Sequence, residues 1–201
     1  MDRYTTYMHK YALAAVVALL IALGVVSSGR SAEDRAEYGL GRLATEEEIR
    51  AWNIDVAPSG EGLPPGQGTV RQGAQVFATK CAACHGPTGT EGRKDRLVGG
   101  QNTLATPKPI KTIGSYWPYA TTLYDYIHRA MPFNAPQSLT PDETYSVIAW
   151  LLFQNKVIAE DAVIDAQSLP KIEMPNRNGF VPDPRPDVRA PTPDALRGGT
   201  R

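Results

Sequence analysis

The spacing of hydrophobic residues predicts three helices in the middle of the chain. Three apolar residues at i, i+4 and i+7 (Val70, Ala74 and Phe77) mark the first helix, in residues 69–80. Leu123 and Ile127 share one face of the second, in residues 121–130. The third begins after Thr140. We therefore expect a helical core between about residues 69 and 154.

The sequence predicts where the third helix begins. Thr140 is a suitable N-cap, Pro141 suits the first helical turn, and Glu143 completes a capping box. Apolar residues then occupy two faces of the helix, so we expect it to be buried on two sides. One face is expected to meet the first helix at Gly73, where the missing side chain lets another backbone approach. The apolar residues on the two faces of this third helix are Tyr145, Val147, Ile148, Ala149, Trp150, Leu151 and Leu152.

No strand pattern of any length stands out in this core, so the predicted fold class is all-α. Outside it, Thr45 and Glu48 form a capping box that predicts one short helix. Residues 57–68 are too rich in proline and glycine for us to expect regular structure there. From residue 182 onward, five prolines up to Pro193 predict a disordered tail.

The N-terminus carries an apolar run of 16 residues, from Tyr11 to Val26, behind Arg3 and Lys10. A charged start and a hydrophobic middle are typical of a secretory signal peptide. The run is also close to the shortest length that spans a membrane, about 17 residues. We therefore expect export to the periplasm, and the sequence leaves open whether this segment is cleaved or stays as an inner-membrane anchor through residues 11–28.

Both cysteines of the chain lie in one pentapeptide, Cys81-Ala82-Ala83-Cys84-His85. This pattern is the attachment site of c-type haem: the two thiols form thioether bonds with the haem vinyl groups, and His85 lies next in sequence to bind the iron. One covalent haem c is thus the predicted cofactor. A small helical domain buries little surface by itself, and we expect this domain to need the porphyrin in order to fold.

Two other sites use a Cys-x-x-Cys pair. A zinc site needs about four ligands, but beyond the motif the chain has no further cysteine and only two histidines, His9 and His128. A redox dithiol should follow a strand, whereas the residues before Cys81 have a helical pattern. Both alternatives fit this sequence less well than haem does.

The sixth ligand of the iron decides between electron transfer and gas chemistry. Met131 precedes a proline in the loop before the third helix, where a sulfur atom could reach the haem opposite His85. Met174 and His128 are the alternatives, and an open position is a further one. His128 is otherwise expected on the helix surface or against a haem propionate. A His/Met pair would raise the reduction potential, because the soft sulfur favours ferrous iron.

Aromatic side chains and charge add two expectations. Tyr116 and Trp117 are expected to line the haem pocket, with plain core packing as the alternative for each ring. The chain has zero formal net charge, yet residues 69–135 carry 8 basic and 3 acidic side chains, while residues 139–175 carry 2 basic and 6 acidic ones. Such a division would orient an approaching redox protein. We expect no nucleic-acid partner.

The boundaries that we predict divide the chain into five segments. They are a signal peptide or anchor (1–30), an extended arm with one short helix (31–68), a cytochrome c haem domain (69–155), an extended segment that packs on the domain or on a partner (156–181), and a disordered proline-rich tail (182–201).

Several longer stretches resemble one family, the c-type cytochrome subunits of bacterial sulfite dehydrogenases and related sulfur-oxidation molybdoenzyme complexes. The haem motif is common to all cytochromes c, and the other stretches are more specific to this group. They are Ala51-Trp52-Asn53-Ile54-Asp55-Val56, Gly62-Leu63-Pro64-Pro65-Gly66, Tyr116 to Thr122, Arg129 to Leu139 and Leu169 to Arg177. Dihaem members carry a second Cys-x-x-Cys-His, so this chain is more similar to the monohaem, sulfite-type subunit.

The resemblance implies a class I cytochrome c domain in a periplasmic electron-transfer subunit. A molybdenum-cofactor partner would oxidise the sulfur compound, and this haem would accept electrons singly for a downstream cytochrome or oxidase. The matched motif implies that Cys81 and Cys84 bind haem and that His85 and Met131 bind iron. The chain would have no bond-making chemistry of its own. Two alternatives remain: a free or membrane-tethered cytochrome shuttle, and a haem gas sensor or peroxidase with an open sixth position.

Overall fold

The computed structural model of the chain describes residues 41–183 and 185. A first unit ends at Ile49 and a second begins at Arg50, and α2 (Glu46–Trp52) spans this boundary. The N–H of Glu48 donates to the Thr45 hydroxyl at 3.2 Å, and the N–H of Thr45 donates to the Glu48 carboxylate at 2.9 Å. The capping box predicted for this short helix is confirmed.

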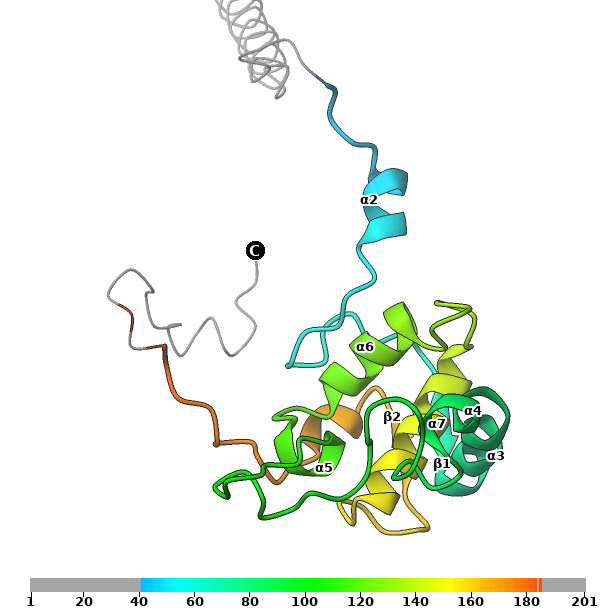
Figure 1. Ribbon diagram of the computed structural model, residues 1–201. Helices are drawn as coiled ribbons and strands as arrows, with labels where there is room; N and C mark the ends of the chain where they lie inside the picture. The colour runs from blue at the N-terminus through cyan, green and yellow to red at the C-terminus, as the bar shows by residue number, and fades with distance from the viewer. Residues whose placement is uncertain (1–40, 184, 186–201) are drawn as a thin grey trace, which may run out of the picture. The chain divides into compact units, whose positions relative to one another are not determined.

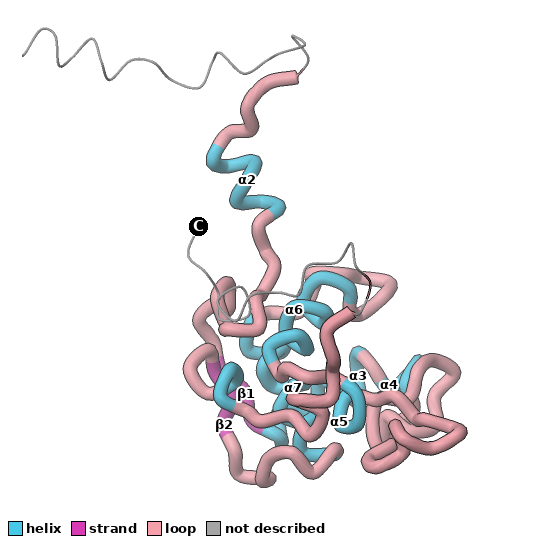
Figure 2. The backbone as a smooth tube through the Cα atoms, turned by 90° about the vertical axis from the view of Figure 1, so that its left-hand side faces the viewer, coloured by secondary structure: helices cyan, strands magenta, loops and turns pink. Residues whose placement is uncertain are grey.

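The second unit is mostly helical, as predicted, and its three main helices match the expected ranges (Figure 1). They are α3 (Val70–Lys80), α6 (Thr121–Ala130) and α7 (Pro141–Gln154). Two single-turn helices, α4 (Ala82–His85) and α5 (Ile113–Tyr116), were not predicted. Long loops join them, as the backbone tube shows (Figure 2).

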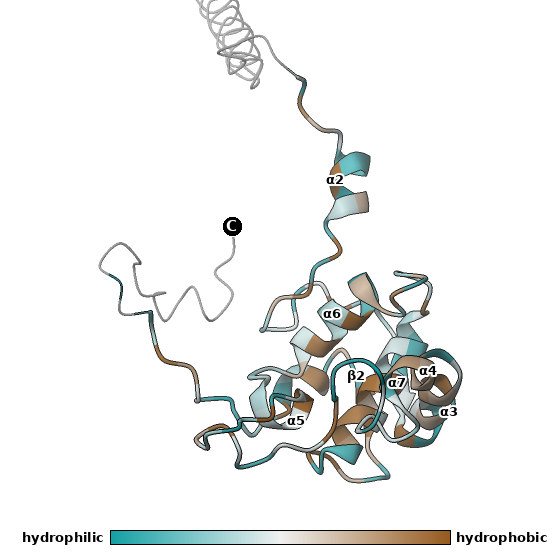
Figure 3. Cartoon of the chain, viewed as in Figure 1, coloured by the Kyte–Doolittle hydropathy of each residue, from teal (hydrophilic) through white to brown (hydrophobic). Residues whose placement is uncertain are grey.

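Helix α7 lies at the centre of the unit and is buried without interruption from Thr144 to Leu152. Apolar residues dominate this stretch (Figure 3). The N–H of Glu143 donates to the Thr140 hydroxyl at 3.2 Å, and the N–H of Thr140 donates to Glu143 at 2.9 Å, so the predicted start is confirmed. Burial on two sides, also predicted, explains why its pattern is more uniformly apolar than that of an amphipathic surface helix.

Helices α3 and α7 pack directly on each other. The rings of Phe77 and Trp150 stack with centroids 4.0 Å apart. A Cβ atom at Gly73 would overlap the Ser146 backbone carbonyl. The close approach predicted at Gly73 is therefore present, and it fixes the position of α3, whose last residue precedes Cys81.

The fold class is all-α as predicted, and the structure adds two short strands at the borders of the helical core. Two strands of three residues, β1 (Gln67–Thr69) and β2 (Val163–Asp165), pair antiparallel with Gly68 opposite Ile164. Strand β1 begins inside the proline- and glycine-rich segment where no regular structure was expected. Three residues are too few to show a period of two, and the pairing partner lies far along the chain.

The segments that flank the helical core also contact it. The N–H of Val56 donates to Asp125 on α6 at 2.9 Å, and the hydroxyl of Tyr145 donates to the Pro64 carbonyl at 2.8 Å. Beyond α7, the side chains of Leu169 and Met174 are buried in the core. A 3₁₀ turn spans Leu169–Lys171.

No helix within residues 41–183 is long and apolar enough to cross a membrane. The apolar run Tyr11–Val26, for which cleavage and anchoring were both considered, lies outside the described residues, as does most of the proline-rich tail.

Candidate haem-binding site

The Cys-x-x-Cys-His motif occupies the junction of α3 and α4. Helix α3 ends at Lys80, and Cys81 leaves helical geometry with φ −121° and ψ −38° before α4 begins. Cys81 is half-buried and packs against the core, whereas Cys84 is exposed. Both thiols therefore lie on the short segment that joins α3 to α4.

The imidazole of His85 is oriented by a backbone carbonyl. Its Nδ1 atom lies 2.9 Å from the carbonyl oxygen of Asp95. A carbonyl only accepts hydrogen bonds, so Nδ1 must carry the proton, which leaves the lone pair of a neutral ring on Nε2. A histidine that binds a metal through one nitrogen commonly donates from the other in this way. His85 is thus prepared to bind iron through Nε2.

The environment of the thiols argues against the two alternative uses of the motif. Burial raises the pKa of Cys81 to about 11, so this thiol is protonated at neutral pH, unlike the low-pKa thiolate of a redox dithiol. No group of three or more His, Cys, Asp or Glu side chains that could hold a metal ion exists in the part of the chain that the structure describes. The two cysteines and the adjacent histidine fit the attachment of haem c.

The two candidate methionine ligands lie in different surroundings. Met131 directly follows α6, is half-buried and packs against the core. Met174 is only 2 % exposed, which means that protein atoms already enclose it. A distal ligand has to present its sulfur atom to the cofactor, so the surroundings of Met131 fit this role better.

The two candidate aromatic residues also lie in different surroundings. Trp117 packs against the core and meets Tyr126 edge to face, with centroids 5.8 Å apart. Tyr116 instead lies between Phe180, at a centroid distance of 5.2 Å, and Lys111, whose Nζ is 4.9 Å from the ring centroid. Cys81, Trp117 and Met131 are thus brought to the same hydrophobic cluster, and Tyr116 is held by the C-terminal segment.

His128, expected at the helix surface or against a propionate, is half-buried on α6. Its Nδ1 atom and the hydroxyl of Tyr124 are buried and find no hydrogen-bond partner among the described residues. Buried polar atoms without a partner are uncommon in folded proteins.

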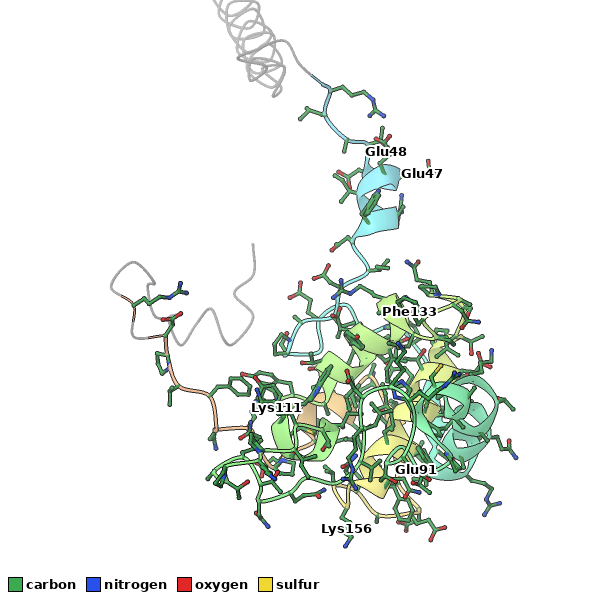
Figure 4. All side chains as sticks on the ribbon, in the orientation of Figure 1. Glu47, Glu48, Glu91, Lys111, Phe133 and Lys156 are labelled. Atoms are coloured by element: carbon green, nitrogen blue, oxygen red, sulfur yellow. The ribbon has the colours of Figure 1, made fainter. Side chains whose placement is uncertain are left out.

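Basic residues are concentrated in the loop that follows the haem motif. Five of them are exposed and make no ion pair with the described residues: Arg93, Lys94, Arg96, Lys108 and Lys111. Figure 4 shows Lys111 beside α5 and Phe133 at the surface beyond the end of α6. Phe133 is 83 % exposed although it follows Met131 by two residues. The loop after the motif thus carries exposed positive charge, and an exposed aromatic ring lies in the loop that follows α6.

Comparison with known proteins identifies the type of domain. The family model described as cytochrome c oxidase, cbb3-type, subunit III matches residues 68–151. That range contains α3, the haem motif, Met131 and most of α7. The fold and the motif together define the class: the chain contains a class I cytochrome c domain with one covalently bound haem c.

A solved structure narrows the class to a family. A chain of the sulfane dehydrogenase SoxCD from Paracoccus pantotrophus is 46 % identical, with a TM-score of 0.69, and the match covers 74 % of this chain and 74 % of that one. A search of curated proteins found no match. The chain belongs to the family of c-type cytochromes of sulfur-oxidation dehydrogenases, as the resemblance implied.

Two contributors to the site were missed by sequence reasoning. The carbonyl of Asp95 has no side-chain signal, because any residue could supply it. Asn155, which contacts the same loop, could have been noticed only as a polar residue directly after α7. Neither could have been assigned without the folded chain.

Proposed function

We propose that the chain is the electron-accepting subunit of a periplasmic sulfur-oxidising dehydrogenase. A partner with a molybdenum cofactor oxidises sulfite or a related sulfur compound, and this subunit passes the electrons on to a downstream cytochrome or oxidase. The observation that carries the proposal is the His85 imidazole, fixed by the Asp95 carbonyl at 2.9 Å, within a chain 46 % identical to part of a sulfane dehydrogenase.

In this proposal, Cys81 and Cys84 hold haem c through thioether bonds, and His85 and Met131 bind its iron. Haem c, when bound, supplies a one-electron couple of moderately high potential. The protein residues contribute position rather than bond-making chemistry. Cys81 anchors the motif against the hydrophobic core, and His85 keeps a fixed protonation at Nδ1.

The exposed cations of residues 93–111 are proposed to meet acidic groups of a redox partner. Opposite charges raise the rate of encounter, and this effect declines as salt screens the charges. The exposed Phe133 offers a separate apolar contact. These features support docking by an electron-transfer protein, which a gas sensor would not need.

The test is to purify the native protein from periplasm and from membranes and to assay the haem-containing fractions for molybdenum. Co-elution of haem and molybdenum supports the subunit. A monomeric haem protein without molybdenum would contradict it and favour the shuttle. Rapid carbon monoxide binding by the reduced protein would contradict Met131 ligation and favour the sensor.

A further inference from the structure

Asn155 lies at the C-terminal end of α7 and uses both ends of its side-chain amide. It is only 2 % exposed. Its Nδ2 donates to the carbonyls of Leu97 at 3.2 Å and Leu151 at 2.9 Å, and its Oδ1 accepts from the N–H of Gly99 at 3.0 Å. The amide therefore joins the loop at residues 97 and 99 to the end of the central helix.

The loop that Asn155 holds is the loop that orients His85. The carbonyl of Asp95, which accepts from the imidazole, lies two residues before Leu97. On the other side, the N–H of Leu97 donates to the Gly89 carbonyl at 2.8 Å. The segment 95–99 is thus fixed between Gly89 and Asn155, and the Asp95 carbonyl has little freedom to turn.

Neighbouring groups keep the Asn155 side chain in place. Gly114 of α5 lies so close that a Cβ atom there would overlap Oδ1. The side chain of Gln101 donates to the main-chain carbonyl of Asn155 at 3.1 Å. The Thr112 hydroxyl also donates to the Gly99 carbonyl. A buried amide with its bonds satisfied on both ends gives a single geometry, and its loss leaves backbone groups unpaired.

We propose that Asn155 is a positioning residue for His85, the histidine that would bind the iron. By holding residues 97 and 99 it keeps the Asp95 carbonyl on Nδ1 of His85, and this fixes the plane of the imidazole and its strength as an electron donor. A histidine that donates a hydrogen bond binds ferric iron more strongly, so loosening this contact should raise the reduction potential. The inference rests on the proposed assignment of His85 as an iron ligand.

The experiment uses the full, haem-loaded chain with Asn155→Leu, which removes both ends of the amide at similar volume. NMR follows the exchange of the His85 Nδ1 proton with solvent, and a redox titration gives the midpoint potential. We expect exchange to be about 10-fold faster, because the net contribution of one hydrogen bond corresponds to about that factor, and the potential to rise.

The matched control is Asn176→Leu. The Asn176 side chain donates to a backbone carbonyl as well, that of Tyr116, at 2.7 Å, but on a different segment. Exchange at His85 should stay within about twofold in this variant, because the contacts of His85 are untouched. Asn155→Asp keeps an acceptor for Gly99 and loses the donor, so it tests the proposal in a milder form if the leucine variant does not accumulate.

Unchanged exchange in the Asn155 variants would overturn the proposal, as would equal acceleration by Asn176→Leu, since that would show general loosening. None of these outcomes depends on which partner protein reduces the haem. An imidazole that is absent from the iron of the unsubstituted protein would instead contradict the site assignment, and failure of a sulfur compound to reduce the haem would contradict the proposed function alone.

Discussion

The α3–α7 contact and the loops beside the haem motif are held together by different forces. The helix contact is apolar and close, with Phe77 stacked on Trp150 and Gly73 against a backbone carbonyl. The loop from residue 86 to 112 is held mainly by hydrogen bonds, such as Asn155 to Leu97 and the Ser115 hydroxyl to the Ile110 carbonyl. Apolar packing therefore holds the two helices together, whereas hydrogen bonds fix the loop that orients the His85 imidazole.

The largest effect should follow from removing both thiols. Cys81→Ala with Cys84→Ala leaves no atom that can form a thioether, so we expect no haem to remain on the protein in a denaturing gel. The domain should also fail to fold stably, because the porphyrin completes its small core. Ala83→Ser, at an exposed position between the cysteines, is the control and should keep the haem. Covalent haem on the double variant would disprove the attachment site.

Substitution of each methionine tests whether its side chain binds the iron or packs in the hydrophobic core. Met131→Ala should change the ferric absorption spectrum and lower the reduction potential, because a thioether ligand favours ferrous iron. Met174→Ala should leave the spectrum unchanged and lower the free energy of unfolding by about 2–5 kcal/mol, since it leaves a cavity in the core. Spectra and chemical denaturation measure both quantities. The reverse pattern would assign Met174 as the ligand, and a changed spectrum in neither variant would point to His128 or an open position.

A methyl group at the helix contact should destabilise the fold without altering the haem. Gly73→Ala places a Cβ where the Ser146 carbonyl lies, and we expect a loss of about 1–3 kcal/mol in the free energy of unfolding. This is notable because alanine at an open helical position would stabilise by about 0.5–1 kcal/mol. Gln75→Ala, exposed on the same helix, is the control. Equal stability of Gly73→Ala and the unsubstituted protein would mean that α3 and α7 are farther apart than described.

The smallest effect concerns pH. The pKa of Glu143 lies below its ordinary value of 4.5. The main cause is the hydrogen bond from the N–H of Thr140, and a smaller one is Lys80, whose Nζ lies 3.3 Å from the Glu143 carboxylate. A lowered pKa means that the ionised carboxylate stabilises the folded state above the ordinary value, and that this stabilisation is lost as the pH falls through the folded pKa. Unfolding midpoints measured from neutral to acidic pH should therefore decline less steeply for Glu143→Gln. Parallel curves would show that this carboxylate does not contribute.

The parts of the fold that could be predicted are those encoded locally. The Thr140-Pro141 start of α7 and the glycine at residue 73 depend on side chains close together in sequence, and both are as expected. The β1–β2 pairing could not be predicted, because residues 67–69 gain their partner from residues 163–165 only after folding. Asp95 acts through a backbone carbonyl, which no residue type reveals.

The central claim is that the haem bound at α4 accepts electrons from a sulfur-oxidising partner. The most direct measurement is anaerobic addition of sulfite to the purified native complex while the haem absorption is recorded. The account predicts that the ferric spectrum converts to the ferrous one, and that separating the chain from its molybdenum partner abolishes the conversion. A native complex whose haem stays ferric with sulfite and with other reduced sulfur compounds would contradict the account.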